Sequence, residues 1–130
     1  MARILVIDDE KPICTLCASA LRVAGYKVLT ANDGFEGVNL FRANPTDAVL
    51  VDLLMPHSGL QVIRVLRETF PDLPIIAMSG YGRRRLEMAS GVGANRILSK
   101  PFAPDELVAL VDDVLDTGEK PKKPAPGTGH

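Results

Sequence analysis

Short runs of Val, Ile, Leu and Ala alternate along the chain with stretches in which apolar residues recur every three or four positions. The runs are continuous rather than alternating, which indicates strands buried on both faces of a sheet. They predict strands at residues 3–7, 27–31, 48–51, 74–78 and 96–98. The helical patterns between and after them predict helices near 12–24, from Asp33 onward, at 60–69, at 83–90 and from 104 to about 115. The second helix has Glu36 three residues after Asp33, which is the spacing of a capping box.

Five strand–helix units in succession predict a parallel sheet with helices on both faces. Because such crossovers are right-handed, few strand orders remain, and 2-1-3-4-5 is the natural one for five units. The predicted fold class is therefore α/β: a flavodoxin-like, doubly wound sheet of five parallel strands with five helices. We expect one domain over residues 1–116 and a disordered tail rich in Lys, Pro and Gly over residues 117–130.

Charge and hydropathy narrow the class of protein. The formal net charge of the 130 residues is -1, which gives no electrostatic case for direct binding of nucleic acid. No stretch approaches the roughly 18 apolar residues of a membrane span. The N-terminal segment lacks the pattern of a secretory signal, so we expect a cytoplasmic protein without a membrane partner.

Cys14 and Cys17 form a C-x-x-C pair, a spacing that also occurs in redox and zinc sites. A structural role is favoured because Cys17 lies on an apolar helical stripe and no second cysteine pair is available to complete a zinc site. The stripe that we expect to face the core consists of Ile13, Leu16, Cys17, Ala20, Leu21 and Ala24.

Polar residues follow the predicted strands at positions where chemistry is expected. Asp8 and Asp9 follow the first strand, and Asp52 follows the third. Ser79 follows the fourth strand and Lys100 the fifth. In an open α/β sheet, ligands bind beyond the carboxyl ends of the strands, where neighbouring strands bring these side chains together. We therefore expect the five residues to share one rim of the sheet.

Three carboxylates on neighbouring strands repel one another, because adjacent strands are only about 4.8 Å apart. A divalent cation with oxygen ligands would relieve this repulsion, and such a site suits Mg²⁺. Asp52, next to the metal and Lys100, has the surroundings of a nucleophile for phosphoryl transfer. Lys100 and Ser79 could then hold oxygens of the phosphoryl group.

The motifs "ILVIDDE", "VDLLMP", "AMSG" and "LSKPF" make the chain resemble the receiver domain of two-component response regulators, of the single-domain type, over about residues 2–116. The resemblance implies that Asp52 is the phospho-acceptor. It also implies that Asp8, Asp9 and Asp52 hold Mg²⁺ together with the backbone carbonyl of Leu54.

By the same resemblance, Ser79 is the switch hydroxyl, Lys100 is the phosphate-binding lysine, and the Lys100-Pro101 peptide bond is cis. The phosphoryl group would come from a phosphohistidine of a sensor histidine kinase or a phosphotransfer protein. The receiver would then switch a docking face for an output protein, acting as a phospho-acceptor switch rather than as an enzyme with its own substrate. One departure from the family pattern is Ile97, which stands where an aromatic residue is usual.

Other functions remain as alternatives. The chain could be a receiver module cut from a larger regulator, or a receiver that has lost phosphorylation and acts as a scaffold. A metal-dependent phosphohydrolase with an aspartyl nucleophile is disfavoured, because Leu54 stands where a second Asp would act as acid and base. A nucleotide or flavin binder is disfavoured because no G-x-x-x-x-G-K-[ST] or G-x-G-x-x-G motif is present.

Overall fold

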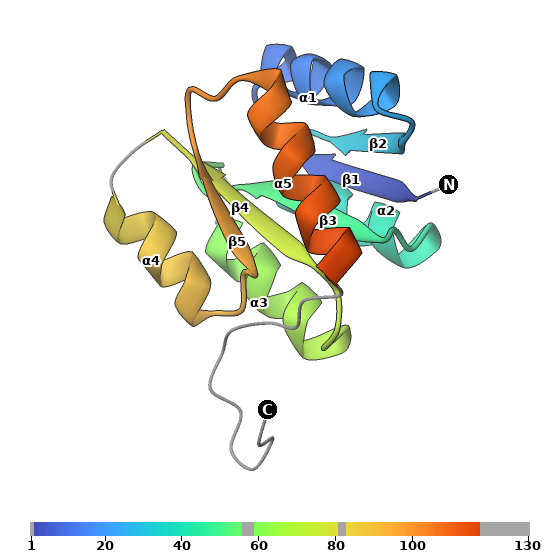
Figure 1. Ribbon diagram of the computed structural model, residues 1–130. Coiled ribbons are helices and arrows are strands. Elements are labelled where there is room, and N and C mark those ends of the chain that lie inside the picture. The colour runs from blue at the N-terminus through green and yellow to red at the C-terminus, as the bar shows by residue number, and fades with distance from the viewer. Residues whose placement is uncertain (1, 56–58, 81–82, 118–130) are drawn as a thin grey trace.

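A computed structural model of the chain describes residues 2–55, 59–80 and 83–117. Strands and helices alternate throughout these residues (Figure 1), as the apolar pattern predicted. The strands are β1 (Arg3–Ile7), β2 (Lys27–Ala31), β3 (Ala48–Asp52), β4 (Ile75–Ser79) and β5 (Arg96–Ser99). The helices are α1 (Lys11–Val23), α2 (Gly34–Ala43), α3 (Gly59–Thr69), α4 (Arg83–Gly91) and α5 (Pro104–Thr117).

All five strands form one parallel sheet in the order β2-β1-β3-β4-β5, which confirms the predicted fold class. The sheet register sets Ile7 beside Val51 and Asp52 beside Met78. Three strands, β3, β4 and β5, end one residue later than the apolar runs suggested, because Asp52, Ser79 and Ser99 still pair within the sheet. These polar side chains are therefore fixed by the sheet and not by loops.

Two apolar cores cover the two faces of the sheet. Along β1, Ile4 and Val6 belong to one core, while Leu5 and Ile7 belong to the other. Side chains from α1 and α5 fill the first core, and those from α2, α3 and α4 fill the second, so the helices lie in two layers on either side of the sheet (Figure 1). This double burial explains why the strands read as continuous apolar runs.

The start of α2 confirms the predicted capping box with one difference. Asp33 precedes the helix, and its carboxylate accepts a hydrogen bond of 2.8 Å from the backbone N–H of Glu36. The carboxylate of Glu36 accepts one of 2.6 Å from the N–H of Asn32, rather than from that of Asp33. Two backbone donors are thus satisfied where the chain leaves β2 for α2.

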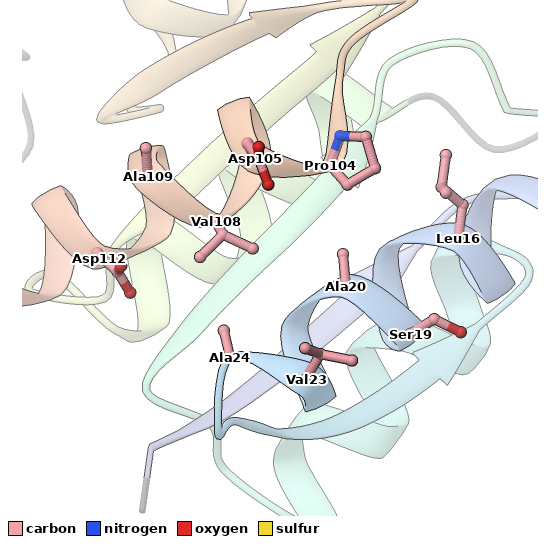
Figure 2. A pocket seen from close by; sticks show the side chains of 10 residues that line it. All are labelled: Leu16, Ser19, Ala20, Val23, Ala24, Pro104, Asp105, Val108, Ala109 and Asp112. Atoms are coloured by element: carbon pink, nitrogen blue, oxygen red, sulfur yellow. The ribbon is translucent and has the colours of Figure 1, made fainter.

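The side of α1 that faces the sheet differs in part from the predicted stripe. Cys17 and Leu21 are buried as expected, but Cys14 and Ala18 complete the buried set. Leu16 lies on a neighbouring stripe that faces α5 across an apolar groove of about 570 Å³ (Figure 2). The groove residues are Leu16, Ser19, Ala20, Val23 and Ala24 of α1, and Pro104, Asp105, Val108, Ala109 and Asp112 of α5. Because the two apolar stripes of α1 are adjacent, the sequence pattern did not show which one meets the sheet.

Arg67, near the end of α3, is buried, with 3% of its surface exposed. Its guanidinium donates to the carbonyl of Gly93 at 2.7 and 3.0 Å and to the Asn95 side-chain oxygen at 2.9 Å. It also donates to the carbonyls of Phe70 and Pro71, at 3.1 and 2.9 Å. Burial lowers the pKa of Arg67 to about 10, and these acceptors satisfy the cation. The arginine therefore joins the end of α3 to the segment that leads into β5.

The predicted domain extends to the end of α5 at Thr117. The predicted disordered tail, residues 117–130, lies outside the described residues except for Thr117. Among the helices that the structure describes, none has the length and apolar character needed to cross a membrane.

Candidate functional site

Four of the five site residues predicted at strand ends are brought to one edge of the sheet. Asp8 follows β1, Asp52 ends β3, Ser79 ends β4 and Lys100 follows β5. Asp8, Asp52 and Ser79 are buried, each with 2% or less of its surface exposed. The backbone N–H of Lys100 donates to the carbonyl of Ser79 at 2.9 Å, which holds the start of the β5–α5 loop against the end of β4.

The Lys100 side chain crosses this edge and reaches three carboxylates. Its Nζ lies 2.8 Å from Asp8 Oδ2, 3.3 Å from Glu10 Oε1 and 3.4 Å from Asp52 Oδ1. Burial alone would lower the pKa of Lys100, but the hydrogen bond to Asp8 and the negative charges of Asp8 and Asp52 outweigh it and raise the pKa. The lysine is therefore a permanent cation in the middle of an acidic cluster. The Lys100-Pro101 peptide bond is cis, as the family resemblance implied.

Asp52 is the carboxylate whose surroundings oppose its charge most clearly. Burial and the nearby charge of Asp8 raise its pKa from 3.8 to about 6. Lys100 and the backbone N–H of Leu54, which donates to Asp52 Oδ1 at 3.3 Å, act in the opposite direction without cancelling the shift. Asp52 is thus ionised at neutral pH in a place where added positive charge is strongly favoured.

The position of Asp8 is set by its own loop and by neighbours on α1 and just after β2. Its carbonyl accepts from the Cys14 thiol at 3.2 Å and from Asn32 Nδ2 at 3.1 Å. Its Oδ1 accepts from the backbone N–H of Glu10 at 2.9 Å, which leaves Oδ2 to Lys100. Both cysteines are free and buried, so the structure agrees with a structural role for the C-x-x-C pair.

The acids that meet at this edge differ in one member from the predicted set. Within the described part of the chain, Asp8, Glu10 and Asp52 each offer a carboxylate oxygen, and these oxygens lie within 4.8 Å of one another. Asp9 is exposed and does not belong to this group. Sequence reasoning missed Glu10, although one signal was available: it is the third of three consecutive acids directly after β1.

Comparison with known proteins decides the family. The model of the response regulator receiver domain matches residues 4–112. This chain belongs to that family. The fold is therefore that of a receiver domain.

Curated relatives of this receiver domain include the response regulator MprA of Mycobacterium sp. (strain KMS), which is 38% identical over 128 residues. The alignment covers 95% of this chain and 56% of that relative, so the chain spans about half the length of the MprA proteins it matches. MprA of Mycobacterium avium (strain 104) is 38% identical over 115 residues, with 50% of its length covered.

Solved structures of similar proteins share the fold at high overlap. One is TrrA from Thermotoga maritima, determined in complex with Mg(2+)-BeF, which is 36% identical and has a TM-score of 0.82. The match covers 88% of this chain and 100% of the TrrA chain. The chemotaxis protein CheY4 of Vibrio cholerae is 29% identical, with a TM-score of 0.83 and 99% of its chain covered by 88% of this one. NtrX from Brucella abortus, solved with ATP, is 29% identical with a TM-score of 0.85, but 90% of this chain covers only 27% of NtrX.

The receiver's donor atoms fit a hard divalent cation. The cluster offers carboxylate oxygens only, which are the ligands that Mg²⁺ prefers over softer metals. Burial and the charge of Asp8 raise the pKa of Asp52 even with Lys100 beside it, so a bound cation would stabilise its ionised form.

Proposed function

We propose that this receiver domain accepts a phosphoryl group on Asp52 from a phosphohistidine of a sensor histidine kinase or a phosphotransfer protein. The observation that carries the proposal is the position of Asp52: a buried strand-end carboxylate with Lys100 3.4 Å away and a pKa raised to about 6. A carboxylate that is ionised at neutral pH but poorly compensated is a ready nucleophile.

In the proposed reaction, an Asp52 carboxylate oxygen forms a bond to phosphorus while the phosphorus–nitrogen bond to the donor imidazole breaks. The imidazole leaves with the electron pair of that bond, and the product is an acyl phosphate. Lys100, already within 3.4 Å of Asp52, is placed to bind an oxygen of the transferred group. Ser79, one position past the partner of Asp52 on β4, is proposed as the hydroxyl that binds another oxygen.

Mg²⁺ would be held by Asp8, Asp9, Asp52 and the backbone carbonyl of Leu54, and it would supply neutralising charge for the phosphoryl oxygens. Asp8 and Asp52 have the required proximity, since both belong to the cluster of carboxylate oxygens described above. Asp9 is exposed on the same loop and would have to turn inward to join them.

Phosphorylation is proposed to switch a docking face for an output protein. Because the chain spans about half the length of its MprA relatives, its use as the receiver module of a larger regulator is the second candidate. Both candidate functions require phosphorylation of Asp52, so this reaction is tested first.

The test is incubation of the protein with acetyl phosphate and Mg²⁺, followed by intact mass spectrometry. We expect one phosphate on the wild-type protein, none after chelation of the metal, and none on Asp52→Asn. Asp116→Asn, which changes an exposed acid of α5, is the matched control and should behave as wild type. Phosphate on the Asp52→Asn variant, or equal labelling without Mg²⁺, would contradict the proposal.

A further inference from the structure

Glu10 occupies the N-cap of α1 but does not cap the helix with its side chain. An N-cap side chain normally accepts a hydrogen bond from a backbone N–H in the first helical turn. The Glu10 carboxylate makes no such bond. It extends instead to the Lys100 ammonium, 90 residues away in sequence and 3.3 Å away in space.

The three carboxylates around Lys100 differ in their exposure. The Asp8 and Asp52 side chains are buried, with 0% and 3% of their surfaces exposed, whereas 61% of the Glu10 side chain is exposed. Only 14% of the Lys100 side chain is exposed. Glu10 therefore lies on the solvent side of the lysine, and Asp8 and Asp52 lie on the sheet side.

We propose that Glu10 is a positioning residue that tethers the Lys100 ammonium in the resting state and competes with the incoming phosphoryl group for it. The inference rests on the proposed function, because it concerns the same lysine. Once a phosphoryl group enters, Lys100 must exchange a carboxylate partner for a phosphoryl oxygen. Glu10 is the exposed partner, and its negative charge also repels an anionic phosphodonor.

The tether can be measured without metal or phosphate. The exchange rate of the Lys100 ammonium protons with water is read by nitrogen-15 NMR in the metal-free protein, with the signal assigned by its loss in Lys100→Arg. We expect exchange to be several-fold faster in Glu10→Gln, which keeps the size of the side chain and removes its charge. Glu68→Gln, which neutralises an exposed acid of α3, is the control and should leave the rate unchanged.

The competition is measured as the second-order rate constant for phosphorylation by acetyl phosphate at saturating Mg²⁺, followed by intact mass over time. Because an exposed ion pair contributes about 0.2–1 kcal/mol, we expect the rate constant of Glu10→Gln to rise by about 1.4–5-fold over wild type. The increase should shrink as salt is added, because exposed charges are screened. Glu68→Gln should match wild type.

Unchanged lysine exchange, or a phosphorylation rate that is unchanged or slower in Glu10→Gln, would overturn the inference. Failure of the proposed function gives a different result, since the wild-type protein itself would then take up no phosphate. If the wild-type protein is phosphorylated on Asp52, but at the same rate as Glu10→Gln, only the role of Glu10 is rejected and the proposed function stands.

Discussion

Asp52→Asn should make the metal-free protein more stable at neutral pH, although it removes the proposed phospho-acceptor. The carboxyl of Asp52 has a pKa of about 6 in the folded protein, above its ordinary value of 3.8, because of burial and the charge of Asp8. The folded state thus holds this proton more tightly than the unfolded state, so the residue destabilises the fold as pH rises through this interval. Asn keeps an oxygen to accept from the N–H of Leu54 and carries no charge.

The size of the effect follows from the two pKa values. At pH 7.5 the full difference applies, and with about 1.36 kcal/mol per pKa unit the Asn variant should gain about 3 kcal/mol in free energy of unfolding. At pH 5 Asp52 is mostly protonated in the folded protein, and the gain should fall to about 1.5 kcal/mol. Comparing variant and wild type at each pH cancels the contributions of the other titrating groups.

Urea unfolding followed by far-ultraviolet circular dichroism measures this difference, with chelator present to exclude metal. Added Mg²⁺ at ten times its Kd should then narrow the gap at pH 7.5 to about half, because it stabilises the protein that binds it by about 1.4 kcal/mol. Equal stabilities at pH 7.5, or a gap that widens toward pH 5, would refute the electrostatic account of Asp52 given above.

Three further predictions concern buried residues other than Asp52. Gly59→Ala should destabilise the protein by about 2 kcal/mol or more and slow phosphorylation, because the added Cβ would overlap the main chain at the end of β3; urea unfolding and the mass assay test both effects. Arg67→Met should lower the free energy of unfolding by about 3 kcal/mol through its unsatisfied carbonyl partners, whereas the exposed Arg64→Met should change it by less than about 0.5 kcal/mol. Burial, and next the charge of Asp8, raise the pKa of Cys14 to about 11 and that of Cys17 to about 12. Both thiols should therefore react with a disulfide reagent only as fast as the protein opens. Fast labelling of the native protein would count against this.

The fold could be predicted closely because its signals are local and redundant. Each buried strand is a continuous apolar run, and each is followed by a helical pattern, so the order of elements left few topologies. That topology in turn predicted that Asp8, Asp52, Ser79 and Lys100 would meet, although Lys100 is far from the others in sequence. The convergence of these residues is a property of parallel sheets and not of any single motif.

The errors arose where side-chain direction matters more than spacing. The apolar residues of α1 form two adjacent stripes, and the pattern gave no means of telling that Leu16 faces α5 rather than the sheet. The three consecutive acids after β1 likewise left side-chain direction open: Glu10 was missed, and the metal-ligand role expected for Asp9 stays a prediction. Asp8 and Glu10 turn toward Lys100 while Asp9 is exposed, a choice made by the turn between β1 and α1 and not by residue type.

The contact between Lys100 and Asp8 joins residues 92 positions apart. A ribosome making this protein completes the acidic edge from β1 and β3 well before it adds the cation that balances it. Nascent chains that stop short of β5 would carry the acceptor carboxylate without its lysine. On the proposed function, the site that accepts the phosphoryl group is therefore complete only once β5 and the residue after it have been made.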